Sequence, residues 1–217
     1  MSRPRWIPIA LVLAVAAVAV AGFALAPEIV RMTQQSGPAS GASQGAAAGQ
    51  SSVQQSDDPA VQAQLDYVLA YWSDYNLDDY GMLDGNDCVN FTSQSLLERG
   101  WQMDEDWWTE GTGTDFDYSS PWVSSTAFRD YLDESGRATA LSDEQRDQVK
   151  LGDVVQFDWD NSGDRDHTGV VTRIDTAGDD VTIYFAGHTD DSDYRSVDDA
   201  ITVDHPGGTA YYWSIPE

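Results

Sequence analysis

The sequence predicts an α+β domain in which helices come first and an antiparallel sheet follows. In residues 59–72, apolar side chains recur at three- and four-residue spacing, which indicates an amphipathic helix. After residue 152 come short runs rich in β-branched and aromatic residues: DVVQFDW, HTGVVTRI, VTIYFAG and TAYYWSI. The turn-forming segments DNSGD and TAGDD between them favour an antiparallel meander.

Two longer helices and one short helix are expected in the first half of the domain. Asp58 should cap the helix of residues 59–72, because Pro59 suits the first helical position. The segment CVNFTSQSLLER, residues 88–99, indicates a second helix with Asn86 or Asp87 as its N-cap, and Gly100 should end it. A short third helix should cover residues 124–132.

The segment between the second and third helices is irregular and rich in aromatic residues, from Trp101 to Trp122. We expect most of these rings to pack in the core. Two or three of them are candidates for the wall of a substrate groove.

The first 32 residues indicate an anchor or an export signal. Arg3 and Arg5 precede an uncharged run from Trp6 to Ala26, about the length that spans a bilayer, whereas cleavable signals have shorter apolar cores. We expect a membrane anchor that leaves the rest of the chain outside the cytoplasm, or a secreted protein if the segment is cleaved. Residues 33–59, rich in Gly, Ala, Ser and Gln, predict a flexible linker, so the folded domain should span residues 60–217.

The charge balance excludes one class of partner. The chain has 11 Lys and Arg against 37 Asp and Glu, a formal net charge of −26, and such a surface repels phosphate backbones. Nucleic acid is therefore not an expected partner. Eight Trp and ten Tyr distinguish the chain from a disordered acidic protein and predict a packed core.

Cys88, the only cysteine, is the candidate nucleophile. It falls in the first turn of the predicted helix 88–99, where unpaired backbone N–H groups and the helix dipole stabilise an anion. A buried, inert cysteine is the alternative interpretation. A single thiol in an exported protein risks oxidation and cross-linking, so its presence favours a function.

A cysteine nucleophile needs a base, and His167 and His188 are the candidates. His167 opens the strand HTGVVTRI and His188 follows the strand VTIYFAG. Because the start of one antiparallel strand lies beside the end of the next, the two histidines can be neighbours, one acting on the thiol and the other orienting the first. His205 lies in the turn-like segment VDHPGGT, and we expect it at the surface.

Two patterns suggest metal sites, and neither is complete. The segment DWDNSGD, residues 158–164, matches the first half of a calcium loop, but Gly169 stands where the loop needs a bidentate Glu. Cys88 and the three histidines lack the compact ligand pairs of zinc sites. We therefore predict no metal and no other cofactor.

Four segments in order resemble the bacterial putative amidase domain family of the amidase-6 type, a relative of papain-like NlpC-type and CHAP cell-wall peptidases. They are YNLDDYGMLDGNDCVNFTSQSLLERGW, SSPWVSSTAFRDYL, LGDVVQFDWDNSGDRDHTGVV and YFAGHTDDSDYRSVDDAI. The resemblance implies a papain-like cysteine hydrolase fold with Cys88 as nucleophile and His167 as base. His188 matches the third position, and Asp190 is the alternative for it.

The resulting functional hypothesis is an extracytoplasmic cysteine amidase or peptidase that cleaves amide bonds in a peptide or peptidoglycan-like substrate. Acyl transfer to an amine uses the same thioester chemistry and stays open. The alternative from another class is a membrane-anchored, catalytically silent binding module that uses the Trp-rich segment as its contact surface.

Overall fold

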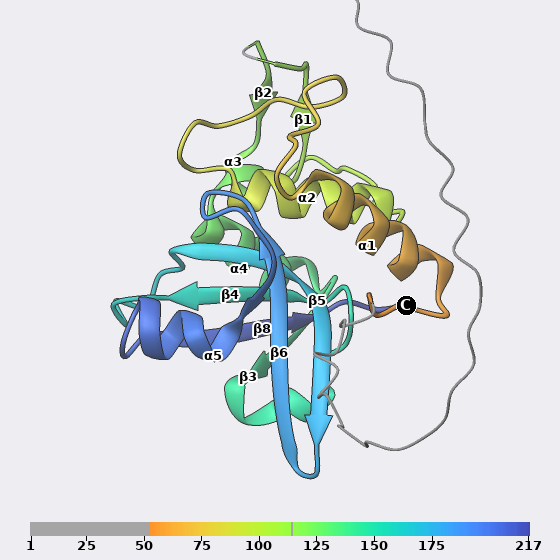
Figure 1. Ribbon diagram of the computed structural model, residues 1–217. Helices are drawn as coiled ribbons and strands as arrows, with labels where there is room; N and C mark the ends of the chain where they lie inside the picture. The colour runs from red at the N-terminus through yellow and green to blue at the C-terminus, as the bar shows by residue number, and fades with distance from the viewer. Residues whose placement is uncertain (1–52, 114) are drawn as a thin grey trace, which may run out of the picture. The chain divides into compact units, whose positions relative to one another are not determined.

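The computed structural model describes residues 53–113 and 115–217, and in them helices pack on a six-stranded antiparallel sheet (Figure 1). The helical elements are α1 (Pro59–Tyr71), α2 (Cys88–Glu98), α3 (Ser120–Val123), α4 (Ser125–Ser135), the 3₁₀ helix η1 (Asp143–Gln148), α5 (Val197–Asp199) and the π-helical turn η2 (Ala200–Asp204). The sheet strands are β3 (Thr139–Ser142), β4 (Val154–Asp158), β5 (His167–Ala177), β6 (Asp180–Gly187), β7 (Ser192–Ser196) and β8 (Thr209–Ser214). A separate two-stranded ribbon joins β1 (Thr109–Glu110) to β2 (Asp117–Tyr118). The α+β prediction is confirmed.

The helices begin where their capping residues predict. Asp58 accepts hydrogen bonds from the backbone N–H groups of Ala60 and Val61, and Pro59 is the first residue of α1. Asp87 is the N-cap of α2, and Gly100 follows its C-cap with a positive φ of 103°. Helix α4 extends further than predicted, to Ser135, and α3 was not predicted.

The order of the strands in the sheet is β3-β8-β4-β5-β6-β7. The predicted meander is confirmed from β4 to β6, since consecutive strands are neighbours there, and the unpredicted β7 continues it. The prediction was wrong for β8, which pairs with β4 and β3 instead of continuing after β7. The short strands β3 and β7 form the two edges of the sheet and were not predicted.

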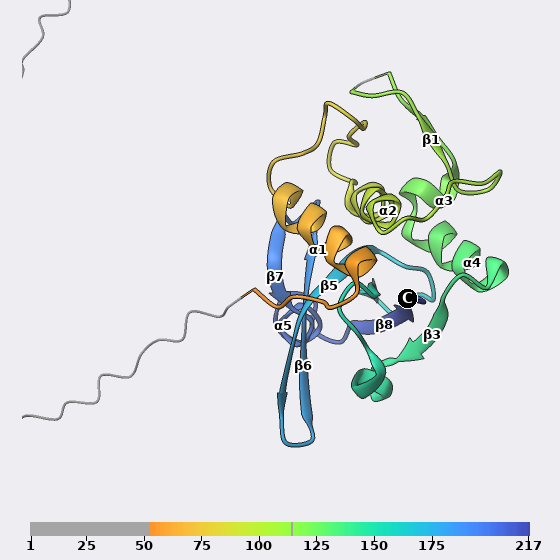
Figure 2. The ribbon, with the colours of Figure 1, turned by 90° about the vertical axis from the view of Figure 1, so that its right-hand side faces the viewer.

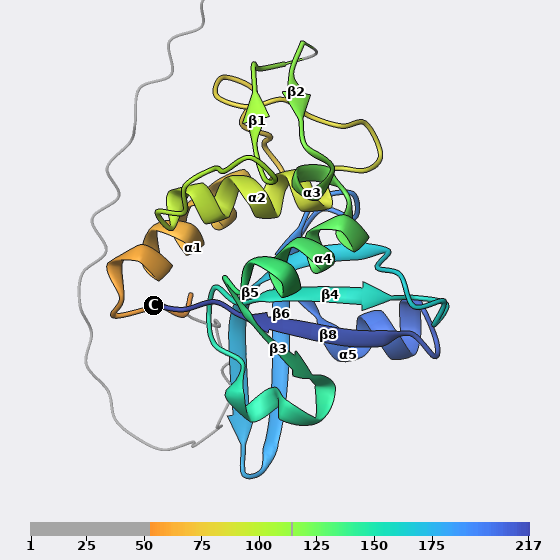
Figure 3. The ribbon, with the colours of Figure 1, turned by 180° about the vertical axis from the view of Figure 1, so that it is seen from behind.

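The sheet buries both of its faces. One face packs against α2 and α4 and carries Val154, Val170, Ala186 and Trp213. The other face carries Val155, Phe157, Val171, Phe185 and Tyr212 and is covered by α5 and η2. Helices α4 and α5 lie on opposite sides of the sheet, as the views from the front and from behind show (Figures 1 and 3). Successive side chains of a strand point to opposite faces, so each strand contributes to both.

Helices α1 and α2 lie next to one another along the first face, as the view from the side shows (Figure 2). Leu65 and Val68 of α1 are fully buried, as their helical spacing predicts. In α2, every residue from Cys88 to Leu96 is buried, so this helix lies inside the domain with all of its sides covered.

The predicted anchor of residues 1–32 lies outside the described residues, as does most of the predicted linker. Among residues 53–113 and 115–217, no helix combines the length and the apolar character that crossing a membrane requires.

Candidate active site

Cys88 is the first residue of α2, and its side chain is 1 % exposed. Turn-rich residues 73–87 lead into the helix, and Asp87 caps it without bonding the first-turn N–H groups through its side chain. The backbone N–H groups of the first turn of α2 are therefore not bonded by the capping side chain, and they lie beside the thiol, as the sequence predicts.

A chain of hydrogen bonds ends at the Cys88 sulfur. Gln156 Oε1 accepts from the Trp213 indole at 2.9 Å, which fixes the orientation of its amide. Gln156 Nε2 donates to Thr168 Oγ1 at 3.1 Å, so the Thr168 hydroxyl donates onward to Ser125 Oγ at 2.9 Å. The Ser125 hydroxyl hydrogen is then free for Cys88 Sγ at 3.7 Å. Every hydroxyl in the chain accepts one bond and donates the next, and the last donor faces the sulfur.

Burial raises the pKa of the Cys88 thiol above its ordinary value. The hydrogen bond from Ser125 and the backbone N–H groups of Thr168 and Val89 oppose this effect, while Asp87 adds to it by charge repulsion. Burial has the larger effect, so at neutral pH the side chain is a thiol. The expectation of a depressed pKa, based on the helix end, is wrong because it left out desolvation.

His188 is held by Asp87, which precedes the cysteine. Its Nδ1 lies 2.6 Å from Asp87 Oδ2, and its Nε2 lies 2.9 Å from the backbone oxygen of Tyr71. The imidazole is stacked between the rings of Tyr75 and Phe91, each at 3.8 Å between centroids. Both side chains of the pair are buried, at 1 % and 3 % exposure.

The contacts of His188 fix the orientation of its ring. Both ring nitrogens face oxygen atoms, Nδ1 the Asp87 carboxyl group and Nε2 the Tyr71 carbonyl. The imidazole is therefore held next to the residue that precedes Cys88 in the chain.

His167 does not lie beside the thiol. It pairs with Phe157 in the register of β4 and β5, and its ring lies 6.0 Å from the ring of Phe157 and 6.1 Å from that of Phe185. The next residue, Thr168, points to the opposite face, where it bonds Ser125. Strand alternation thus places His167 and Cys88 on different faces of the sheet, and no hydrogen bond joins them in the described part of the chain.

The prediction that His167 and His188 lie beside one another is wrong, because strand alternation also places these two side chains on different faces of the sheet. Gly187, which precedes His188, faces His167: a β-carbon at Gly187 would lie 3.4 Å from His167 Nε2. His188 itself points to the face that carries Cys88. Which of the three side chains act in catalysis stays a prediction, but the structure places only Cys88 and His188 on one face.

Burial lowers the pKa of His167 to about 4, with a further contribution from Arg195. Its Nε2 is buried without a hydrogen-bond partner among the described residues. The alternative third residue, Asp190, is exposed and lies 3.3 Å from Arg195. His205 is half-buried and stacks on Trp159 at 4.0 Å, so the expectation of a surface position holds only in part.

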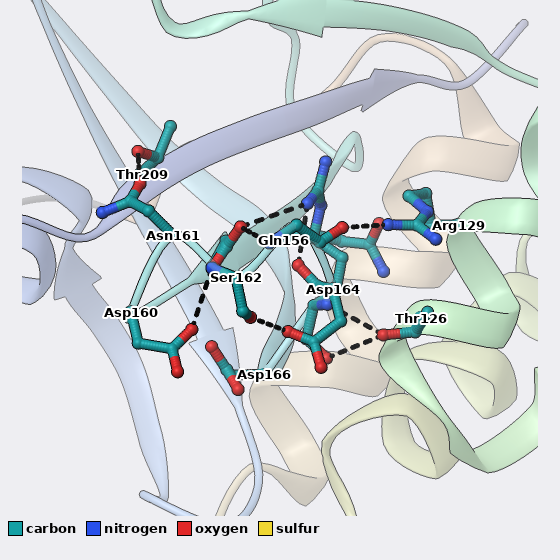
Figure 4. A network of polar contacts seen from close by, with 12 residues as sticks. Thr126, Arg129, Gln156, Asp160, Asn161, Ser162, Asp164, Asp166 and Thr209 are labelled. Atoms are coloured by element: carbon teal, nitrogen blue, oxygen red, sulfur yellow. Dashed lines mark hydrogen bonds and ion pairs between the residues drawn. The ribbon is translucent and has the colours of Figure 1, made fainter.

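A second group of polar side chains occupies the loop between β4 and β5 (Figure 4). Carboxylate oxygens of Asp158, Asp160, Asp164 and Asp166 lie within 4.8 Å of one another, so this group could hold a cation. Backbone N–H groups of Ser162 and Gly163 already bond Asp158, which is buried at 1 % exposure. The loop is ordered by these bonds and by the bond from Arg129 to the Gly163 carbonyl at 2.6 Å.

The aromatic segment between α2 and α3 contributes mainly to the core. Trp107 and Trp122 are fully buried and lie 4.8 Å apart between ring centroids. Their indole N–H groups bond Ser93 and Asn90 of α2, at 3.1 and 2.7 Å. The expectation that most of these rings pack in the core holds for these two tryptophans.

The sequence predicted Cys88 and His188 as site residues but did not identify their partners. Asp87 could have been found, because it directly precedes the cysteine. Ser125 and Thr168 carry no such signal in the sequence. Ser125 lies in the first turn of a helix, and Thr168 lies in a strand whose sequence predicts only that it is buried.

The comparisons with known proteins identify one family. No curated protein and no solved structure matches this chain. The sequence profile of the family described as "Putative amidase domain" matches residues 58–213, which include every site residue described above. The chain therefore belongs to the putative amidase domain family.

Proposed function

We propose that this chain is a cysteine amidase or peptidase that cleaves amide bonds through Cys88. Membership of the amidase domain family supports an amide-hydrolysing role. The observation that supports Cys88 as the nucleophile is the hydrogen-bond chain that ends with the Ser125 hydroxyl 3.7 Å from Sγ. That hydroxyl and the backbone N–H groups of Thr168 and Val89 lower the pKa of the thiol against the effect of burial.

In the proposed reaction, the Cys88 sulfur forms a bond to the amide carbonyl carbon and the C–N bond breaks. His188 takes the thiol proton as the sulfur attacks and passes it to the leaving amine. Water then attacks the thioester, one proton of that water goes to the sulfur, and the carboxylic acid is released. We assign this role to His188, because His167 points to the other face of the sheet.

The backbone N–H groups at the start of α2 are the proposed oxyanion donors, since they lie beside Cys88. Because the sulfur is 1 % exposed, the substrate has to displace side chains that cover it. A helix that begins with the cysteine and packs on an antiparallel sheet is the arrangement expected of a papain-like hydrolase, and we propose that relationship for this domain.

The proposed substrate is a peptide or peptidoglycan-like amide outside the cytoplasm. This part of the proposal rests on the sequence of residues 1–32, which predicts a membrane anchor or signal. The domain's few basic side chains argue for recognition of the peptide part and against tight binding of anionic wall polymers.

The test compares the full chain with Cys88→Ala on a panel of peptides and muropeptides, with products identified by mass spectrometry. Cys88→Ala should reduce hydrolysis by several orders of magnitude, because no other thiol is present. Ser93→Ala is the matched control, since it removes a buried hydroxyl of α2 that bonds Trp122 and Trp107. Undiminished cleavage by Cys88→Ala would end the proposal.

A catalytically silent binding module is the second candidate, and the burial and raised pKa of the thiol favour it. Such a module would need a contact surface. Because Trp107 and Trp122 are fully buried, the partly exposed Trp101 and Trp108 are the tryptophans of this segment that could supply it. A wild-type protein that binds peptides, cleaves none of them and loses binding on Trp108→Ala would support this candidate.

A further inference from the structure

A cavity of about 270 Å³ lies between α4 and the strands β3 and β8. Its charged lining consists of Arg129, Asp130, Asp133 and Arg165, and its aromatic lining includes Tyr211 and Trp213. The volume is close to the lower limit of about 300 Å³ for ligand pockets, so the cavity suits a small molecule.

Arg165 is the less completely paired of the two arginines in the cavity. Its Nη1 bonds the Asp164 carbonyl at 2.8 Å, but the carboxylate of Asp158 is 3.8 Å away. Its Nε is buried and has no acceptor among the described residues. The guanidinium lies over the ring of Tyr211, 3.6 Å from its centroid, which keeps its plane in one orientation.

Arg129 adds a second guanidinium to the same wall. It lies one helical turn after Ser125 in α4, bonds the Gly163 carbonyl, and pairs with Asp130 at 2.8 Å. Burial and the nearby charge of Arg129 lower the pKa of Arg165, as expected when two cations repel each other. Two neighbouring arginines are unusual in a chain with a net charge of −26, and a carboxylate placed between them would relieve the repulsion.

The cavity also offers a site for a positive group. Asp133 is exposed and has no ion-pair partner in the part of the chain that the structure describes, whereas Asp130 already pairs with Arg129. The lining thus contains two arginines and two aspartates, whose formal charges cancel. A simple anion would leave Asp133 unpaired and would be repelled by the acidic surface.

We propose that this cavity binds a free amino acid with an apolar side chain. The carboxylate of the ligand lies at Arg165 and Arg129, its ammonium group lies at Asp133, and its side chain packs against Tyr211 and Trp213. This proposal goes beyond amide hydrolysis and does not depend on Cys88, which is not part of the cavity lining.

The test measures binding of three molecules of nearly equal shape to the full chain by isothermal titration calorimetry. Leucine carries both charges, leucinamide lacks the carboxylate, and 4-methylpentanoate lacks the ammonium group. Leucine should bind saturably with one site per chain, and each analogue should bind at least about tenfold more weakly, the loss expected for one charge-assisted contact. Absence of saturable leucine binding, or equal binding of the three molecules, would overturn the proposal.

Variants locate the site. Arg165→Gln and Asp133→Asn should each weaken leucine binding at least about tenfold, and the exposed Asp133 keeps the test decisive if Arg165→Gln fails to fold. Arg173→Gln is the matched control, because Arg173 pairs with Asp175 on β5 and does not line the cavity. Cys88→Ala should bind leucine as the wild type does, which separates this proposal from the proposed hydrolysis. Unchanged binding by Asp133→Asn would refute the assigned site.

Discussion

Removing one side chain of the buried Asp87–His188 pair should destabilise this domain. A buried hydrogen-bonding group that loses its partner costs about 1–3 kcal/mol. The 2.6 Å contact and the exposures of 1 % and 3 % place this pair in that class. For a domain of this size each kcal/mol lowers Tm by about 2–4 °C, so Asp87→Ala should lower Tm by about 2–12 °C.

A double-mutant cycle separates the pair from its surroundings. Asp87 also accepts bonds from Leu83 and Asn90, and His188 stacks on two rings, so each single variant loses more than the pair. These additional losses cancel in the cycle of Asp87→Ala, His188→Ala and the double variant. The coupling free energy should be about 1–3 kcal/mol.

The assay is urea unfolding followed by circular dichroism at pH 7, with the free energy of unfolding extrapolated to water. Asp79→Ala is the control, since this exposed carboxylate bonds Asn76 at the surface and should change stability by less than about 0.5 kcal/mol. The reasoning would be refuted if the effects of the two single variants on the free energy of unfolding summed to the effect of the double variant within about 0.5 kcal/mol.

Two further predictions concern titration. Cys88 labelled with ¹³C at Cβ gives a single resonance, because it is the only cysteine. At about pH 8.5, the ordinary thiol pKa, this resonance should still report a thiol, since burial raises the pKa of Cys88. A titration midpoint below the ordinary thiol pKa would contradict this prediction. The pKa of His167 is lowered to about 4, so as the pH falls the unfolded chain binds a proton at this residue before the folded chain does. The stabilisation from neutral His167 is therefore fully present above about pH 6.5 and is lost as the pH falls toward 4. This proton binding amounts to about 3 kcal/mol, so a change from about pH 6.5 to about pH 4 should lower the free energy of unfolding of the wild type by about that much more than that of His167→Phe. Equal acid sensitivity of the two proteins would show that His167 is not buried in its neutral form.

The local signals in the sequence were sufficient for the main elements. Asp58 and Pro59 begin α1, Asp87 begins α2, and the alternating runs after residue 152 form β4, β5, β6 and β8. Caps and hydrophobic periodicity act over a few residues, so they can be read without knowing the fold. The position of Cys88 at the start of a helix followed from the same signals.

The position of β8 between β3 and β4 and the faces of the histidines depended on long-range packing. His167 and His188 belong to neighbouring strands, but a change of one position in strand register exchanges the two faces of a sheet. Register is set by which side chains the completed core buries, here Phe157 and Phe185 around His167 and Phe91 around His188. The sequence by itself determined which residues could carry the chemistry and which elements hold them, whereas only the tertiary structure decided that Cys88 and His188 share one face and that His167 lies on the other.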